Sequence, residues 1–329
     1  MGIVDDRRPG LNPAVAEVRR NVRAHLPAEG TIIVGLSGGA DSLALAAAVA
    51  FEAPGRGVAV VIDHGLQSGS AEVAAAAARA AEGLGLRARV ARVEVPSVGG
   101  PEAAARSARY TALRGAAREE GADAVMVAHT LDDQAETVLL GLARGSGAGS
   151  LQGMSPTSDF DGIALIRPLL DVRRETTRAA CVAEGLTPWD DPHNVDDRYT
   201  RVRVRRHILP VMEDELGPGI AEALARTATQ LREDAAAFDE MIDETIEDIV
   251  EPAEAGIAVS VAALAANPAA LRHRIIRHVV ASEFHQSLTR TQTVAVARLV
   301  THWSGQGAID LPGCRARRVA GTIEFTRRE

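Results

Sequence analysis

Short apolar runs rich in β-branched residues alternate with longer alanine-rich stretches between residues 31 and 130. The apolar runs predict strands over 31–37, 58–64, 87–95 and 124–129, and the alanine-rich stretches predict helices near 41–52, 70–84 and 101–120. Strands that alternate with helices form βαβ units. We therefore predict an α/β fold with a Rossmann-like parallel sheet and helices on both faces.

Polar side chains gather in the loops that follow three of these strands. The loops are SGGADS (37–42), DHGLQSGS (63–70) and HTLDDQAET (129–137). Because the carboxyl ends of parallel strands meet at one edge of the sheet, and ligands bind at that edge, we expect the three loops to form one site.

The second half of the chain has a different pattern. Residues 213–250 show helical spacing of apolar positions up to Pro252, and they predict a connecting helix. Beyond it, helix patterns at 268–282 and 288–303 mix with strand-like segments at 256–261 and 321–326. We predict a first domain over 1–212, a helical linker over 213–250 and a small α+β domain over 251–329.

The distribution of charge changes what the net charge implies. The chain carries a net charge of −8, which by itself disfavours a nucleic-acid partner. Residues 213–248, however, hold 12 acids and 2 arginines, so the rest of the chain sums to +2. Basic runs at 201–207, 272–278 and 315–318 could therefore meet phosphates. Solvated surface arginines are the alternative for each run taken alone.

Cysteine usage and the apolar segments limit the class of protein. Cys181 and Cys314 are far apart and form no CxxC pair, which argues against a zinc site, an iron–sulfur cluster or a disulfide scaffold. The first 20 residues contain no apolar core of a secretion signal, and no segment approaches the roughly 20 apolar residues of a membrane span. These features predict a cytoplasmic protein without a membrane partner.

The loop at residues 37–42 has the chemistry of a pyrophosphate site. Gly38 and Gly39 allow backbone N–H groups to turn inward, a helix that begins near Asp41 adds partial positive charge, and the Ser37 and Ser42 hydroxyls add donors. A carboxylate beside a phosphate suggests a bridging Mg²⁺ on Asp41. A simple helix cap at Asp41 or Ser42 is the alternative. The spacing matches neither the Walker A nor the GxGxxG pattern.

This loop resembles the PP-loop of the N-type ATP pyrophosphatases, which cleave ATP to AMP and pyrophosphate. Within that superfamily, several further segments resemble the tRNA(Ile)-lysidine synthetases in order and spacing. They are DHGLQ (63–67), ARSARY (105–110), AHTLDDQAET (128–137), RGSGAGSLQGM (144–154), IRPLL (166–170) and DPHNVDDRYTRVRVRRHILP (191–210).

The resemblance implies a ligase reaction. ATP adenylylates the C2 carbonyl oxygen of the wobble cytidine in a tRNA(Ile) with a CAU anticodon, and the ε-amino group of free L-lysine then displaces AMP to give lysidine. The implied cofactors are ATP and Mg²⁺, and residues 251–329 would recognise tRNA. A homodimer stays open, because no stretch of the sequence identifies an interface.

The resemblance also implies roles for single residues. Asp133 and Glu136 would bind the lysine; their spacing puts them on one helix face, although acids at a helix start also favour the macrodipole. His129 would contact phosphate or the activated base, unless it is only a hydrogen-bonded loop residue. The residues expected to bind ATP are Ser37, Gly38, Gly39, Ala40, Asp41 and Ser42. The residues expected to act in catalysis are Asp41, Asp133, Glu136 and His129. The residues expected to contact tRNA are Arg106, Arg109, Arg144, Arg201, Arg203 and Arg205. Arg106 and Arg109 could instead be ordinary surface arginines. Arg144 and the glycines after it could instead form a helix C-cap.

The sequence departs from the family pattern at Gln67, Thr130 and Val202, where arginine, histidine and asparagine are common. Three rival functions would each need different residues. A tRNA thiolase on the same fold would need a cysteine near the ATP site, and an amidating relative would need a glutaminase segment. A nucleotide- or RNA-binding module without catalysis would not need the three acids Asp41, Asp133 and Glu136.

Overall fold

The computed structural model describes residues 12–65, 69–93, 101–145, 147–253 and 256–328. The chain divides into two compact units, residues 1–231 and 232–329, and the division falls inside the segment that was expected to link two domains. Among the described helices, none is long and apolar enough to cross a membrane.

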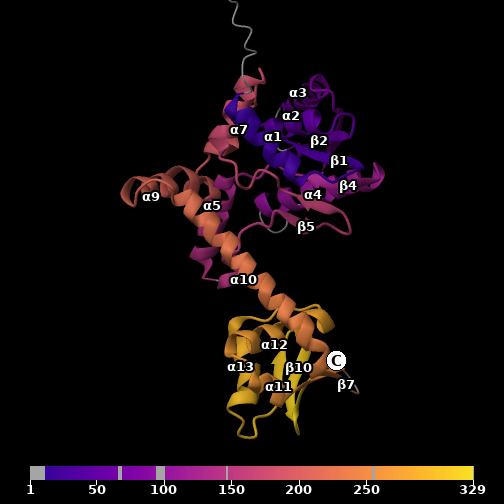
Figure 1. Cartoon of the computed structure of the whole chain (residues 1–329), viewed down its shortest axis with the longest axis vertical. Coiled ribbons are helices and arrows are strands. Elements are labelled where there is room, and N and C mark those ends of the chain that lie inside the picture. The colour runs from indigo at the N-terminus through magenta and orange to yellow at the C-terminus, as the bar shows by residue number, and fades with distance from the viewer. Residues whose placement is uncertain (1–11, 66–68, 94–100, 146, 254–255, 329) are drawn as a thin grey trace, which may run out of the picture. The chain divides into compact units, whose positions relative to one another are not determined.

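The first unit alternates helices and strands (Figure 1). Its elements are α1 (Pro13–His25), β1 (Thr31–Leu36), α2 (Ala40–Glu52), β2 (Gly57–Asp63), α3 (Ser70–Gly83), β3 (Arg87–Arg92), α4 (Pro101–Glu119), β4 (Ala122–Met126), α5 (Leu131–Arg144), α6 (Ala148–Leu151), β5 (Thr157–Asp159), β6 (Ala164–Ile166), α7 (Arg174–Ala183), the 3-10 helix η1 (Pro192–Val195), α8 (Thr200–Arg203), the π-helical turn η2 (Val204–Ile208), α9 (Leu209–Glu215) and the long α10 (Ile220–Ile249). The predicted βαβ alternation is confirmed.

Six strands form one sheet in the order β3-β2-β1-β4-β6-β5. All neighbouring pairs are parallel except β5 and β6, which are antiparallel. The predicted Rossmann-like parallel sheet is confirmed, and it carries one antiparallel pair at its edge, where β5 and β6 are separated by a turn too short for a helical crossover. The chain leaves β1 toward β2 on one side and returns through β4 on the other. This reversal of strand order creates a crevice at the carboxyl ends of the strands.

Helices cover both faces of the sheet. Apolar side chains of α1, α2, α3 and α7 pack on one face, where Val34 and Leu45 are fully buried. Helix α4 packs on the other face through Leu113 and Ala117. Helix α1 was not predicted; its buried Val15, Val18 and Val22 follow helical spacing.

Residues 213–250 were predicted to form one helix, and the structure divides them between two helices. Helix α9 ends at Glu215, and α10 begins at Ile220 after a turn with two left-handed glycines, Gly217 and Gly219. The Glu213 carboxylate caps α10 by accepting the Gly219 amide at 2.6 Å. The π-helical turn η2 precedes Pro210, which has no N–H for the regular helical hydrogen bond.

The second unit is α+β, as predicted, and includes the C-terminal part of α10. Its other elements are β7 (Val250–Ala253), β8 (Gly256–Ser260), α11 (Val261–Ala266), α12 (Ala269–Phe284), α13 (Arg290–Thr301), β9 (Ile309–Leu311), β10 (Cys314–Val319) and β11 (Thr322–Arg327). Its five strands pair antiparallel in the order β7-β8-β11-β10-β9 around buried Ile275, Phe325 and Leu264. Strands β7, β9 and β10 and helix α11 were not predicted.

Candidate active site

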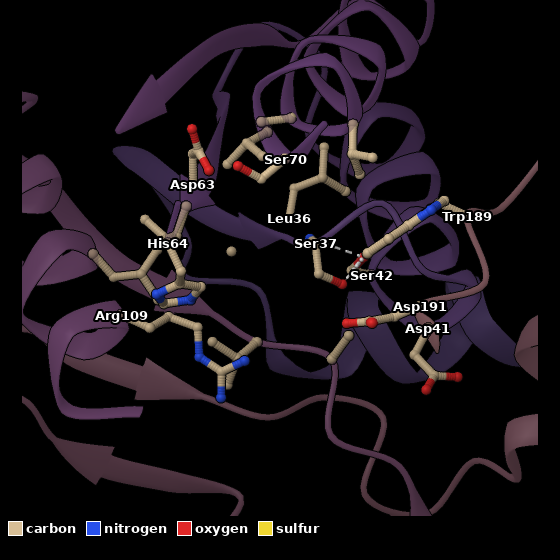
Figure 2. Close-up of a pocket in the computed structure, with 18 of the residues that line it drawn as sticks. Leu36, Ser37, Asp41, Ser42, Asp63, His64, Ser70, Arg109, Trp189 and Asp191 are labelled. Atoms are coloured by element: carbon tan, nitrogen blue, oxygen red, sulfur yellow. Dashed lines mark hydrogen bonds between the residues drawn. The ribbon is translucent and has the colours of Figure 1, made fainter. Parts of the chain in front are cut away.

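A cavity of about 370 Å³ opens at the carboxyl ends of β1, β2 and β4. Figure 2 shows Ser37 and Ser42 on one side of it and His64 and Arg109 on another. The lining side chains include Leu36, Ser37, Asp41, Ser42, Val61, Asp63, His64, Ser70, Arg109, Tyr110, Leu113, Val127, His129, Trp189, Asp191 and His193. The three polar loops predicted from the sequence therefore share one site.

The first loop is held in shape by its own serines. The Ser42 hydroxyl accepts the Ser37 amide at 3.2 Å and donates to the Gly39 carbonyl at 2.9 Å, and it lies 3.0 Å from the Ser37 hydroxyl. No side chain caps α2 at Gly39, so the cap interpretation of Asp41 or Ser42 is not realised. The first amides of α2, beginning at Ala40, have no helical acceptor. These free N–H groups are of the kind that can bind an anion.

Gly38 has a left-handed backbone with φ of 84°. A Cβ there would lie 3.3 Å from the Ala77 Cβ of α3. The Gly38 carbonyl accepts the Trp189 amide at 2.9 Å, which ties the loop to the 187–200 segment. Trp189, Asp191 and His193 line the cavity, although no site role was predicted for them from the sequence.

The carboxylate of Asp41 points away from Ser37 and Ser42 (Figure 2). Asp41 Oδ1 accepts a short hydrogen bond from the Thr177 hydroxyl, and Oδ2 lies 3.5 Å from Arg174 Nε. Burial raises the pKa of Asp41, an effect that Thr177 and Arg174 partly oppose. Neither Thr177 nor Arg174 was singled out from the sequence.

The two carboxylate oxygens of Asp133 have different kinds of partner. Its Oδ2 accepts the Thr130 amide and hydroxyl, both at 2.9 Å, and so completes a capping box at the start of α5. Its Oδ1 accepts Arg174 Nη2 at 2.8 Å. The helix-start interpretation of Asp133 is therefore realised, and its role in lysine binding stays a prediction.

Glu136 is fully buried and surrounded by guanidinium groups. Its nearest partner is Arg205, whose Nε lies 2.6 Å from Oε1; Arg174 follows at 3.4 Å and Arg201 at 3.7 Å. The spacing prediction that Asp133 and Glu136 share one helix face is confirmed by their common partners Arg174 and Arg205.

Arg174 joins the two halves of the site. Its backbone N–H donates to Asp132 Oδ2 at 2.8 Å, and its guanidinium reaches Asp41, Asp133 and Glu136. Burial would lower the pKa of Arg174, but the three carboxylates outweigh burial and raise it. Burial would likewise raise the pKa of Asp133, but Arg174 and other positive neighbours lower it. The Asp133 carboxylate and the Arg174 guanidinium therefore hold each other in their charged forms.

His129 follows β4 and lines the cavity. The side chain is half-buried, and its Nδ1 is buried without a hydrogen-bond partner among the described residues. Burial lowers the pKa of His129 to about 3, with Arg109 acting in the same direction and Asp133 against it. The imidazole is consequently neutral at physiological pH.

The low pKa of His129 predicts an acid-sensitive contribution to stability. Because its pKa in the folded protein lies below the usual value near 6.5, the unfolded chain takes up the proton first. This contribution is complete above about pH 6.5 and declines as the pH falls toward 3. We expect His129→Gln to reduce the loss of unfolding free energy between pH 7 and 5 by about 1–2 kcal/mol, measured by urea titration. His302→Gln at an exposed site is the control, and equal pH profiles for all three proteins would contradict the prediction.

The arginines expected to contact tRNA occupy different environments. Arg106, Arg144 and Arg203 are exposed, whereas Arg109 is half-buried in the cavity wall. Arg201 donates to the Thr137 hydroxyl at 3.0 Å. Gly145 has φ of 64° and caps α5, so the C-cap interpretation beside Arg144 is realised. Arg205 is committed to Glu136, a partner that the sequence pattern did not reveal.

The three departures from the family pattern have local explanations where the structure describes them. Thr130 is buried and caps α5 with its hydroxyl. Val202 is buried in α8. Gln67 lies outside the described residues.

Asp41 is the magnesium ligand predicted from the sequence. Within the described part of the chain, no group of three His, Cys, Asp or Glu side chains could hold a metal. Both oxygens of Asp41 already face Thr177 or Arg174, so this carboxylate as placed does not fit a resident Mg²⁺. A magnesium ion that enters as Mg·ATP would take most of its ligands from phosphate and water.

Comparison with known families accounts for most of the chain. Residues 14–212 match the family described as PP-loop domain, and residues 260–323 match the TilS substrate binding domain. A solved structure of the U34-tRNA thiolase NcsA from Methanococcus maripaludis aligns with a TM-score of 0.56 at 19% identity, over 67% of this chain and 80% of that one. At that identity the likeness supports the fold alone.

Relatives match over nearly their whole length. The chain is 59% identical to the tRNA(Ile)-lysidine synthase of Leifsonia xyli over 92% of both chains. It is 49% identical to the enzyme of the same name from Thermobifida fusca, over 95% of this chain and 98% of the relative. It is also 49% identical to the enzyme of the same name from Mycobacterium tuberculosis, over 92% of this chain and 91% of the relative. Because two family models and these relatives cover most of the chain, it belongs to the tRNA(Ile)-lysidine synthase family, a family of PP-loop ligases.

Proposed function

We propose that the protein acts in the cytoplasm and uses Mg·ATP to adenylylate the C2 carbonyl oxygen of the wobble cytidine in a tRNA(Ile) with a CAU anticodon. The ε-amino group of free L-lysine then attacks C2 and displaces AMP, which gives lysidine. The carrying observation is that Arg174 contacts both Asp41 beside the glycine loop and the Asp133–Glu136 pair. In this proposal, a nucleotide site and a cation site adjoin at Arg174.

The glycine loop suits the nucleotide. The Ser37 hydroxyl and the first amides of α2 would donate to the leaving pyrophosphate, and the helix dipole favours the growing negative charge. In this proposal the loop residues Ser37–Ser42 hold the phosphates, and Mg²⁺ arrives with ATP.

The carboxylate pair suits the lysine. Asp133 and Glu136 would hold an ammonium group in a site shielded from water. Such a pair raises the pKa of an ammonium and so favours binding over deprotonation. With a pKa near 3, His129 is a weak base, and its neutral ring suits a hydrogen bond to the base or phosphate. Most of the rate would then come from positioning the amine against the activated cytidine.

The arginines around the cavity suit the tRNA. Arg106 and Arg109 stand beside Tyr110, with guanidinium-to-ring distances of 5.1 and 5.7 Å. We assign these two to the wobble nucleotide, and exposed Arg144 and Arg203 to backbone phosphates. Arg201 and Arg205 would contact tRNA only through guanidinium N–H groups that do not bind Glu136.

The test incubates the purified protein with ATP, Mg²⁺, radiolabelled lysine and a tRNA(Ile) with a CAU anticodon, in parallel with a methionine tRNA that shares this anticodon. Lysine incorporation into the isoleucine tRNA alone is the expected result. AMP release without lysine incorporation would instead favour another PP-loop tRNA-modifying or amidating ligase. Failure to bind or cleave ATP would favour a non-catalytic RNA-binding module.

Thiolation is the nearest rival chemistry, and Cys181 does lie beside the glycine loop, where its Sγ–H donates to the Ala40 carbonyl at 3.3 Å. Cys181 is buried in α7, and burial raises its pKa to about 11, so the thiolate is scarce at neutral pH. Cys314 is buried in β10 of the other unit.

A further inference from the structure

The carboxylates proposed to bind lysine already hold cations. Asp133, Glu136 and Asp41 face Arg174, and Glu136 also faces Arg205 and Arg201. Three negative groups thus meet three positive groups. A lysine ammonium added to this arrangement would bring an extra positive charge into a buried place without a free counter-ion, which is costly.

Arg174 is the cation best placed to leave. Its backbone is fixed by the bond from its N–H to Asp132, while its guanidinium spans from Asp133 Oδ1 at 2.8 Å to Asp41 Oδ2 at 3.5 Å. Asp41 is the second residue of α2, directly beside the loop amides. Phosphates bound at that loop would repel Asp41 and attract the guanidinium, and arginine pairs well with phosphate oxygens.

We propose that Arg174 is a shared counter-ion which holds the carboxylate pair in the empty site and transfers to the phosphates when ATP binds. This transfer frees Asp133 and one edge of Glu136 for the lysine ammonium, so ATP binding strengthens lysine binding. By linkage, lysine strengthens ATP binding to the same extent. The inference rests on the proposed function and makes Arg174 a positioning residue of that reaction.

The test measures lysine affinity by calorimetry on the full chain, with and without Mg²⁺ and α,β-methylene-ATP, in which the cleaved bond is blocked. For the unmodified protein we expect lysine to bind about tenfold more tightly with the analogue, within the usual range of coupling between sites. In Arg174→Gln the two affinities should agree within about twofold. Arg174→Lys keeps the charge and should retain part of the coupling.

Arg178→Gln is the matched control. Arg178 lies on the same helix, but its side chain is 64% exposed and it pairs only weakly with Asp190 at 3.4 Å. This variant should keep the full tenfold coupling. Unchanged coupling in Arg174→Gln, or equal loss in both variants, would overturn the role of Arg174. If Arg174→Gln does not fold, Arg174→Lys decides the test. Full coupling in Arg174→Lys would support a positive charge at this position as the link between the two sites, and complete loss of coupling in that variant would overturn it.

The unmodified protein separates this inference from the function beneath it. Equal lysine affinity with and without the analogue overturns the counter-ion transfer and leaves lysidine synthesis standing. No lysine binding in either condition, together with no lysine incorporation into tRNA, overturns the proposed function itself.

Discussion

Replacement of Glu136 by alanine is expected to lower the free energy of unfolding by about 3 kcal/mol, because it leaves a guanidinium cluster without its buried carboxylate. Glu136 is fully buried, and Arg205 lies 2.6 Å from it. The partner arginines keep some exposure and can turn toward water, which places the loss at the lower end for a broken buried pair. Urea denaturation measures this change.

The same variant should separate the two substrates. If Glu136 binds the ammonium, the apparent KM for lysine rises at least about tenfold, while ATP binding changes little. Glu136→Gln keeps the side-chain volume and should fold better, with a similar KM defect. Glu175→Ala removes an exposed acid of α7 and should alter stability by less than about 0.5 kcal/mol. An unchanged KM for lysine in the Glu136 variants would refute the assignment of lysine to this pair.

Alanine at Gly38 is expected to weaken ATP binding at least about tenfold. A side chain at φ of 84° costs about 1–2 kcal/mol in backbone strain. The added Cβ would also crowd the Ala77 Cβ at 3.3 Å and so displace the loop from α3. Because the phosphate donors surround this residue, the strain falls on the proposed pyrophosphate site. Titration with ATP measures the affinity, and thermal denaturation measures the stability.

Gly121→Ala separates backbone strain from damage to the loop. Gly121 also has positive φ, at 57°, and a Cβ there would meet nothing within 4 Å. It lies in the turn before β4, away from the cavity lining. We expect this variant to lose a comparable amount of stability and to bind ATP normally. An equal fall in ATP affinity in both variants would show that the loop has no special role.

Local chemistry was the part of the site that the sequence determined. The spacing of Asp133 and Glu136 on one helix face, and the turn at Gly38 after a strand, depend only on residues a few positions apart. The meeting of three polar loops followed from the general topology of parallel sheets. The main strands of the first unit were also predicted from local residues, because each is a run of apolar, β-branched positions. The short antiparallel β5 has too few residues for a periodic signal.

The partners of the charged residues were decided only by the tertiary structure. Arg174 contacts Asp41 across 133 positions, and Arg205 contacts Glu136 across 69. From the sequence, Arg205 was one of several arginines in a basic run that was expected to contact tRNA, and no role was predicted for Arg174. A guanidinium pairs with whichever carboxylate the fold brings within reach, and its own sequence neighbours do not encode that choice. Residue type therefore defined which charges the site contains, and the packing of α7 and η2 against α5 and α2 defined how they neutralise one another.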